Sequence, residues 1–77
     1  DTTISFDLAE QGLVTIDVFN IRGQKVKTLV RDSFVTGHHS VVWNGTDAKG
    51  KQVSSGLYFY RMRTPNYIST RKMILLK

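Results

Sequence analysis

The 77-residue sequence contains no cysteine and a single proline. Without cysteine the chain can form neither a disulfide, nor a thiolate zinc site, nor a thiol nucleophile. No apolar run approaches the roughly 20 residues of a membrane-spanning helix, and the start of the chain lacks the basic and apolar regions of a signal peptide. A domain of this length must therefore use most of its apolar residues for one small core.

Side chains suited to catalysis are also scarce. His38 and His39 are adjacent, so on a strand they would point to opposite faces and could not serve one site. The carboxylates show no paired acid–base motif, and the sequence has neither a G-x-S-x-G motif nor a glycine-rich phosphate loop. We therefore predict a domain that is not an enzyme and needs no cofactor.

The net charge of +5 would permit contact with nucleic acid, anionic lipid or acidic polysaccharide. The basic residues are scattered over nearly every predicted hairpin and form no obvious stripe. Since nucleic-acid-binding domains concentrate their basic residues on one face, we do not expect nucleic acid as a partner.

Apolar residues alternate with polar ones and show no helical spacing, which predicts half-buried strands. The expected strands lie around residues 4–8, 14–18, 26–30, 41–43, 57–62 and 68–76, with a weak one near Phe34 and Val35. The glycines and Pro65 fall between these runs. This pattern predicts one all-β domain over residues 1–77, a small antiparallel immunoglobulin-like β-sandwich of about seven strands, with an open barrel as the alternative.

Two segments, "NIRGQKV" at 20–26 and "DAKGKQV" at 47–53, share one turn template. Asn20 or Asp47 begins the turn, where its side chain can accept a hydrogen bond from the backbone N–H two residues later. Gly23 and Gly50 then stand where a type I turn ends in a left-handed residue. We expect both segments to be structural hairpin turns.

The segment around the second turn has alternative interpretations. Asn44, Thr46 and Asp47 offer closely spaced oxygens of the kind that calcium prefers, but a calcium loop normally gathers several carboxylates and only one is present. We therefore predict a turn and no metal. Trp43 is expected in the centre of the sandwich with its indole N–H bonded, the alternative being a tryptophan that stacks on a ligand.

The segment "GLYFYRM" holds an aromatic strand. Tyr58 and Tyr60 should share one face, with Leu57 and Phe59 on the other, because side chains alternate along a strand. One face belongs to the core, and the other could be a platform. Exposed tyrosines could stack sugars or bases, although the strand matches an RNA-recognition motif only loosely.

Four segments follow one another along the chain in the order and spacing of a known family. They are "TTISFDL", "VTIDVFNIRGQKVKTLV", "GHHSVVWNGTDAKGKQVSSGLYFYRM" and "RKMILLK". Together they resemble the carboxy-terminal sorting domains of the type IX (Por) secretion system and the related immunoglobulin-like domain of the flagellar hook-capping protein. The resemblance covers almost the whole chain. Its most specific parts are the W-N-G loop with the following D-x-x-G, the strand in "SSGLYFYRM" and the terminal "KMILLK".

This resemblance implies a non-catalytic domain that ends a larger protein secreted by a Gram-negative bacterium or displayed on its surface. We expect the domain to be a monomer. Its partners would be the outer-membrane secretion and sortase machinery, the amino-terminal cargo domain of the same chain and, for anchored cargo, surface lipopolysaccharide. Two segments, "SSGLYFYRM" and "RKMILLK", match the family's signal regions. The resemblance therefore suggests six recognition residues in them: Gly56, Tyr58, Arg71, Lys72, Met73 and Lys77.

Each of these residues also has a structural interpretation. Gly56 could relieve the backbone before a strand, Tyr58 could act as in the tyrosine corner of related folds, and Met73 could lie in the core. Arg71 and Lys72 could guard an exposed strand against sheet-to-sheet association. The alternative function is a structural accessory module that spaces or stabilises an extracellular enzyme, contacts carbohydrate or builds a surface assembly, because a fold alone does not decide function.

Overall fold

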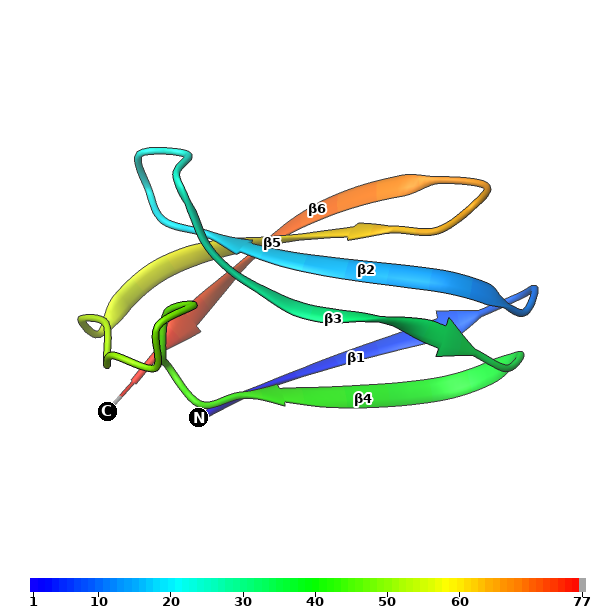
Figure 1. Cartoon of the computed structure of the whole chain (residues 1–77), viewed down its shortest axis with the longest axis horizontal. Helices are drawn as coiled ribbons and strands as arrows, with labels where there is room; N and C mark the ends of the chain where they lie inside the picture. The colour runs from blue at the N-terminus through cyan, green and yellow to red at the C-terminus, as the bar shows by residue number, and fades with distance from the viewer. Residues whose placement is uncertain (77) are drawn as a thin grey trace.

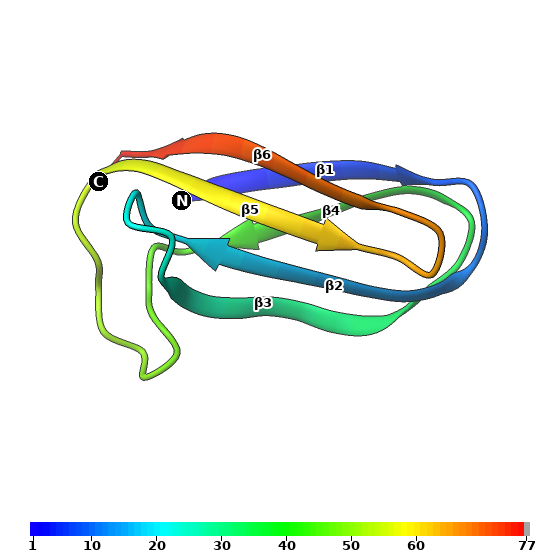
Figure 2. The same cartoon turned by 90° about the horizontal axis from the view of Figure 1, so that it is seen from above.

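The computed structural model describes residues 1–76, which form six strands and no helix. The strands are β1 (Thr2–Leu8), β2 (Gly12–Phe19), β3 (Lys25–Phe34), β4 (Gly37–Trp43), β5 (Gly56–Arg63) and β6 (Ile68–Leu75). β1 pairs with β4, while the other four strands form a second antiparallel sheet in the order β3-β2-β5-β6. The two sheets face each other as layers (Figures 1 and 2), which confirms the predicted small antiparallel β-sandwich.

The strand count differs from the prediction of about seven. Phe34 is the last residue of β3, and Val35 lies in the connection to β4, so no separate strand forms there. The reason is the length of the β2–β3 hairpin, whose pairing continues as far as Gly12 opposite Phe34. Sequence alternation shows where residues are extended, but pairing decides whether two runs join into one strand.

The core lies between the two layers and follows the predicted alternation. β1 contributes Ile4, Phe6 and Leu8, all of which are buried, while the residues between them are exposed. β2, β4, β5 and β6 complete the buried set with Val14, Ile16, Val18, Trp43, Tyr58, Met62, Met73 and Leu75. Full burial of one such apolar side chain stabilises the fold by about 1.5–3 kcal/mol. Inward-facing apolar residues on β1, β2, β4, β5 and β6 therefore supply most of the core and much of the stability of the sandwich.

The two sheets also meet through aromatic contacts. The rings of Phe6 on β1 and Phe34 on β3 lie 5.5 Å apart at 77°, and His39 on β4 packs against both rings. Edge-on packing of this kind adds about 0.5–1.5 kcal/mol to the burial of the rings. It fixes the two-stranded sheet over the end of β3.

The face of β5 that carries the two tyrosines points into the core. Tyr58 is buried and Tyr60 packs partly buried against the core. The prediction that the two tyrosines share a face is therefore confirmed. The suggestion that they form an exposed platform is wrong, because their face is the core face. The outer face carries Leu57 and Phe59 instead.

The two turns of the shared template have the same geometry. Asn20 Oδ1 accepts hydrogen bonds from the N–H groups of Arg22 at 2.9 Å and Gln24 at 3.0 Å. Asp47 Oδ1 accepts equivalent bonds from Lys49 at 2.9 Å and Lys51 at 3.0 Å. The glycines three positions on have φ of 80° and 82°, the left-handed values that the template predicted.

The Asp47 carboxylate belongs to this turn. The hydrogen bond from the Lys51 N–H is the main cause that lowers the pKa of the Asp47 carboxyl below its ordinary value, and the bond from Lys49 adds to it against a partial opposing effect of burial. Thr46 in turn donates its hydroxyl to Asn44 Oδ1 at 2.7 Å. The three side chains considered as calcium ligands thus hold the loop by local hydrogen bonds. Within residues 1–76 no three His, Cys, Asp or Glu side chains gather into a group that could hold a metal ion.

Gly23→Val and Gly50→Val are each expected to destabilise the domain by about 1–2 kcal/mol, because a β-branched residue is strained at positive φ. A Cβ at either position meets no atom within 4 Å, so the expected loss comes mainly from the strained backbone. Urea unfolding curves measure the effect. Gly23→Asn and Gly50→Asn are the controls and should lose less, because asparagine tolerates the left-handed region. Unchanged stability in both valine variants would contradict the shared template.

The remaining connections close the sandwich without helices. The segment between β4 and β5 turns back on β3, where the N–H of Ala48 donates to the Val26 carbonyl at 3.1 Å. It also contains an isolated bridge between Thr46 and Gln52. Within the described residues there is no helix of the length and hydrophobicity that a membrane crossing requires.

Candidate recognition surface on the four-stranded sheet

Five of the six residues that the resemblance suggests as recognition residues lie on the β5–β6 hairpin. Gly56 pairs with Leu75, and Tyr58 pairs with Met73. Arg71 and Lys72 lie opposite Tyr60 and Phe59 in the same register. The fold therefore collects two distant sequence segments into one element. Lys77 falls outside the described residues.

Two members of this set have their side chains in the core. Tyr58 packs edge-on against Trp43, with ring centroids 5.0 Å apart at 74°, and its hydroxyl donates to the Ser54 carbonyl at 2.7 Å. Met73, which is also buried, lies beside it on β6. The folded domain cannot present these side chains to a partner. They position the hairpin, as the structural interpretation of Tyr58 and Met73 proposed.

The other described members are accessible. Arg71 and Lys72 are exposed neighbours whose side chains leave opposite faces of β6. Arg71 lines a cavity of about 330 Å³ together with Phe6 and Asp7 of β1 and Tyr60 of β5. Gly56 is exposed at the start of β5, with φ of 146° and open space where a Cβ would stand. The hairpin thus offers two cations in two directions.

β6 is also an edge strand. Its described pairing is with β5 alone, and its other side approaches β1, where the Thr2 hydroxyl donates to the Ile74 carbonyl at 3.1 Å. Figure 2 shows β6 and β1 lying at the same side of the molecule. An edge strand carries main-chain groups that can pair with another chain, and charged residues limit such pairing. Arg71 and Lys72 lie on this edge strand, where their charges can either prevent pairing with another chain or favour pairing with a particular partner.

A charged cluster on the outer face of the same sheet was not predicted from the sequence. Asp17 is completely buried on β2, and its Oδ1 accepts a hydrogen bond from the Thr28 hydroxyl at 2.8 Å. Lys25 Nζ lies 3.7 Å from Oδ1, while the Arg61 and Arg63 guanidinium groups lie 3.8 and 3.7 Å from Oδ2. The only sequence signal was a lone aspartate between two core residues, since its partners come from two other strands.

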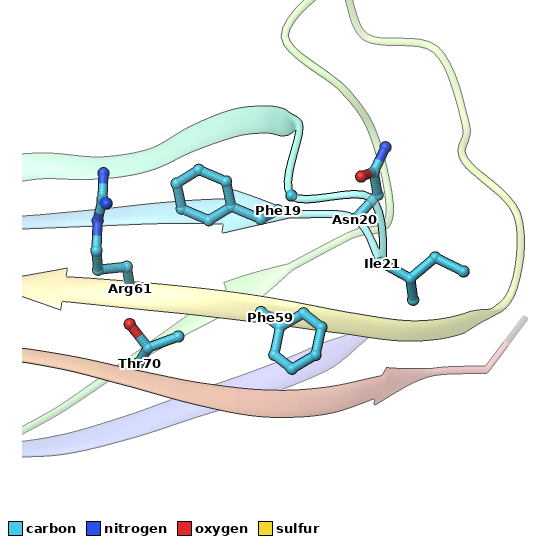
Figure 3. A pocket seen from close by; sticks show the side chains of 7 residues that line it. Phe19, Asn20, Ile21, Phe59, Arg61 and Thr70 are labelled. Atoms are coloured by element: carbon cyan, nitrogen blue, oxygen red, sulfur yellow. The ribbon is translucent and has the colours of Figure 1, made fainter.

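Beside this cluster the outer face has a shallow groove of about 320 Å³. It is lined by Phe19, Asn20, Ile21, Gly23, Phe59, Arg61 and Thr70 (Figure 3). The Arg61 guanidinium carbon lies 4.9 Å from the centroid of the Phe19 ring, a cation–π contact that holds the side chain against the sheet. The β2–β3 turn places Ile21 near Phe59 at the other end of the groove.

A comparison with protein-family models finds the FlgD Ig-like domain over residues 1–66. The chain belongs to the FlgD Ig-like domain family. No curated protein and no solved structure gives a significant match. The matched residues include β1 to β5 and end before β6 begins at Ile68. The charged pair Arg71–Lys72 therefore lies beyond the residues that match the family model.

Proposed function

We propose that this Ig-like domain is a non-catalytic carboxy-terminal sorting domain that directs an exported protein across the outer membrane by type IX secretion. The observation that carries the proposal is the placement of "RKMILLK", whose resemblance to the family's terminal signal was noted from the sequence. Its first six residues include the end of edge strand β6, with Arg71 and Lys72 exposed and Met73 and Leu75 anchored in the core. This arrangement presents two charges to the secretion machinery on a strand that is anchored in the core.

On this proposal the domain follows an amino-terminal cargo domain in a larger protein. The protein is secreted or held at the surface of a Gram-negative bacterium. The direct partners are the outer-membrane secretion and sortase machinery, with surface lipopolysaccharide as the anchor where the cargo stays attached. Recognition in the folded domain falls to Gly56, Arg71 and Lys72, with Lys77 as the last predicted contact.

A second candidate function is an accessory module that spaces or stabilises its neighbour or helps to build a surface assembly. The family match favours it, because the FlgD Ig-like model matches the sandwich through β5 and ends before β6. A spacer requires only a stable fold with stable edges. A sorting domain also requires that the secretion machinery recognise its last strand. The two candidates therefore differ in the importance of the β6 charges.

The test is a fusion of residues 1–77 to a periplasmic reporter in a type IX-competent bacterium. We expect the fusion to reach the medium or the cell surface, and Arg71→Ala with Lys72→Ala to leave it in the periplasm. Lys77→Ala is then added as a third change. Isolated surface substitutions usually cost less than about 0.5 kcal/mol each, so the variant should melt close to the parent domain.

The matched control is Arg22→Ala with Lys49→Ala, which removes the same charge from two exposed turn residues far from β6 in sequence. This control should be exported normally. Undiminished export of the β6 variant would reject the recognition role of these charges. Retention of the unaltered fusion in the periplasm would reject the sorting function and favour the accessory module.

A further inference from the structure

The outer face of β5 is divided into an apolar half and a basic half. Alternation places Leu57, Phe59, Arg61 and Arg63 on this face in chain order, since Tyr58 and Met62 point into the core. Two apolar side chains are thus followed by two guanidinium groups along one strand. No other layer of the described structure covers this face (Figure 1).

The neighbouring strands extend the apolar half. Ile74 lies opposite Leu57, and Phe59 lies between Phe19 on β2 and Lys72 on β6, so one cation also borders this half. Ile21 reaches the same end from the β2–β3 turn and lines the groove with both phenylalanines. Leu57, Ile74 and Ile21 are 41%, 62% and 71% exposed, which is unusual for three large apolar residues gathered at one end of a sheet. A clustered apolar surface of this kind typically marks an interaction site.

The basic half has an excess of accessible positive charge. Asp17 is the only carboxylate on β2, β5 and β6, and its side chain is 1% exposed. The side chains of Lys25, Arg61 and Arg63 around it remain 52%, 39% and 48% exposed. The aspartate therefore holds these cations in place from below and is itself shielded from any partner. An approaching molecule meets the cations.

We propose that this face binds an extended polypeptide segment whose same-side residues read apolar, apolar, acidic, acidic. Alternate residues of an extended chain lie about 7 Å apart on one side, which is the spacing of the Leu57, Phe59, Arg61 and Arg63 side chains along β5. A segment aligned with β5 would place its apolar residues over Phe59 and its carboxylates over Arg61 and Arg63. Carboxylate recognition by guanidinium groups is strong and directional.

Charge complementarity with a peptide suits this groove better than contact with a lipid surface. Arg61 is held against the Phe19 ring and over Asp17, so it cannot extend freely toward a membrane plane as a snorkelling side chain does. The groove volume of about 320 Å³ suits one or two side chains. The inference does not depend on the sorting proposal, because its test uses only the purified domain and labelled peptides and involves no export.

The test uses fluorescein-labelled peptides and the purified domain, with binding followed by anisotropy. The probes are Phe-Ser-Phe-Ser-Glu-Ser-Glu and its reverse, both blocked at the ends, since either chain direction fits the pattern. One control alternates the residues as Phe-Ser-Glu-Ser-Phe-Ser-Glu, and another replaces glutamate by lysine. We expect one probe to bind at least about tenfold more tightly than both controls, equivalent to one favourable charged contact.

Domain variants then locate the site. Leu57→Ser with Ile74→Ser should weaken binding of the probe about tenfold, and Arg63→Gln should weaken it severalfold and reduce its salt dependence. Val42→Ser is the control, because Val42 is 56% exposed on β4 of the other sheet, and it should bind normally. Equal affinity for probes and controls would overturn the proposal. So would binding to phosphatidylglycerol vesicles without preference among the peptides.

Discussion

Trp43→Ala should remove most of the stability of this domain, with an expected loss of about 3–5 kcal/mol, as for other buried aromatic residues replaced by alanine. A domain of this size is typically stable by only about 4–11 kcal/mol. Trp43 is completely buried and packs edge-on against Tyr58. Its indole N–H also donates to the Thr46 carbonyl at 2.9 Å, so the substitution opens a cavity and leaves that acceptor without its donor.

Urea unfolding monitored by circular dichroism measures this loss. Trp43→Phe is the matched variant, because it keeps a ring in the cavity but removes the N–H, and it should lose distinctly less than alanine. Val42→Ala, one residue away on the exposed side of β4, should change stability by less than about 0.5 kcal/mol. A Trp43→Ala domain less than about 1 kcal/mol below the parent would contradict the assignment of this tryptophan to the core.

Asp17→Ala is expected to destabilise the domain by about 2–3 kcal/mol. Breaking a fully buried ion pair costs about 3–5 kcal/mol, but here the cations are about half exposed and can regain water when the carboxylate is removed. The variant also deprives the Thr28 hydroxyl of its acceptor. Three positive side chains would then remain around a small cavity with no charge to balance them.

Asp17→Asn separates charge from hydrogen bonding, since the amide oxygen can still accept from Thr28. We expect it to lose part of the stability that alanine loses, and we expect added salt to recover some of the loss in both variants by screening the repulsion among the cations. Thermal melts at low and high ionic strength make this comparison. An Asp17→Ala domain as stable as the parent would show that the cluster does not stabilise the fold.

The candidate site was only partly predictable from the sequence. The residues of the β5–β6 hairpin were named from a resemblance, but the division between buried Tyr58 and Met73 and exposed Arg71 and Lys72 required the packing of the sheets. The outer-face groove was not anticipated. Its residues come from β2, the β2–β3 turn, β5 and β6, and no local pattern says which strands become neighbours.

The sequence by itself determined the features that depend on near neighbours in the chain. Alternation along each run specified the strands, and the Asn20–Gly23 and Asp47–Gly50 templates specified two turns, because turn hydrogen bonds and left-handed glycines involve only a few consecutive residues. Tertiary structure decided which face of β5 is internal, the merging of Phe34 into β3 and the burial of Asp17. Those outcomes depend on pairing and layer contacts between residues far apart in sequence, where one strand has several possible partners and only the packed core selects among them.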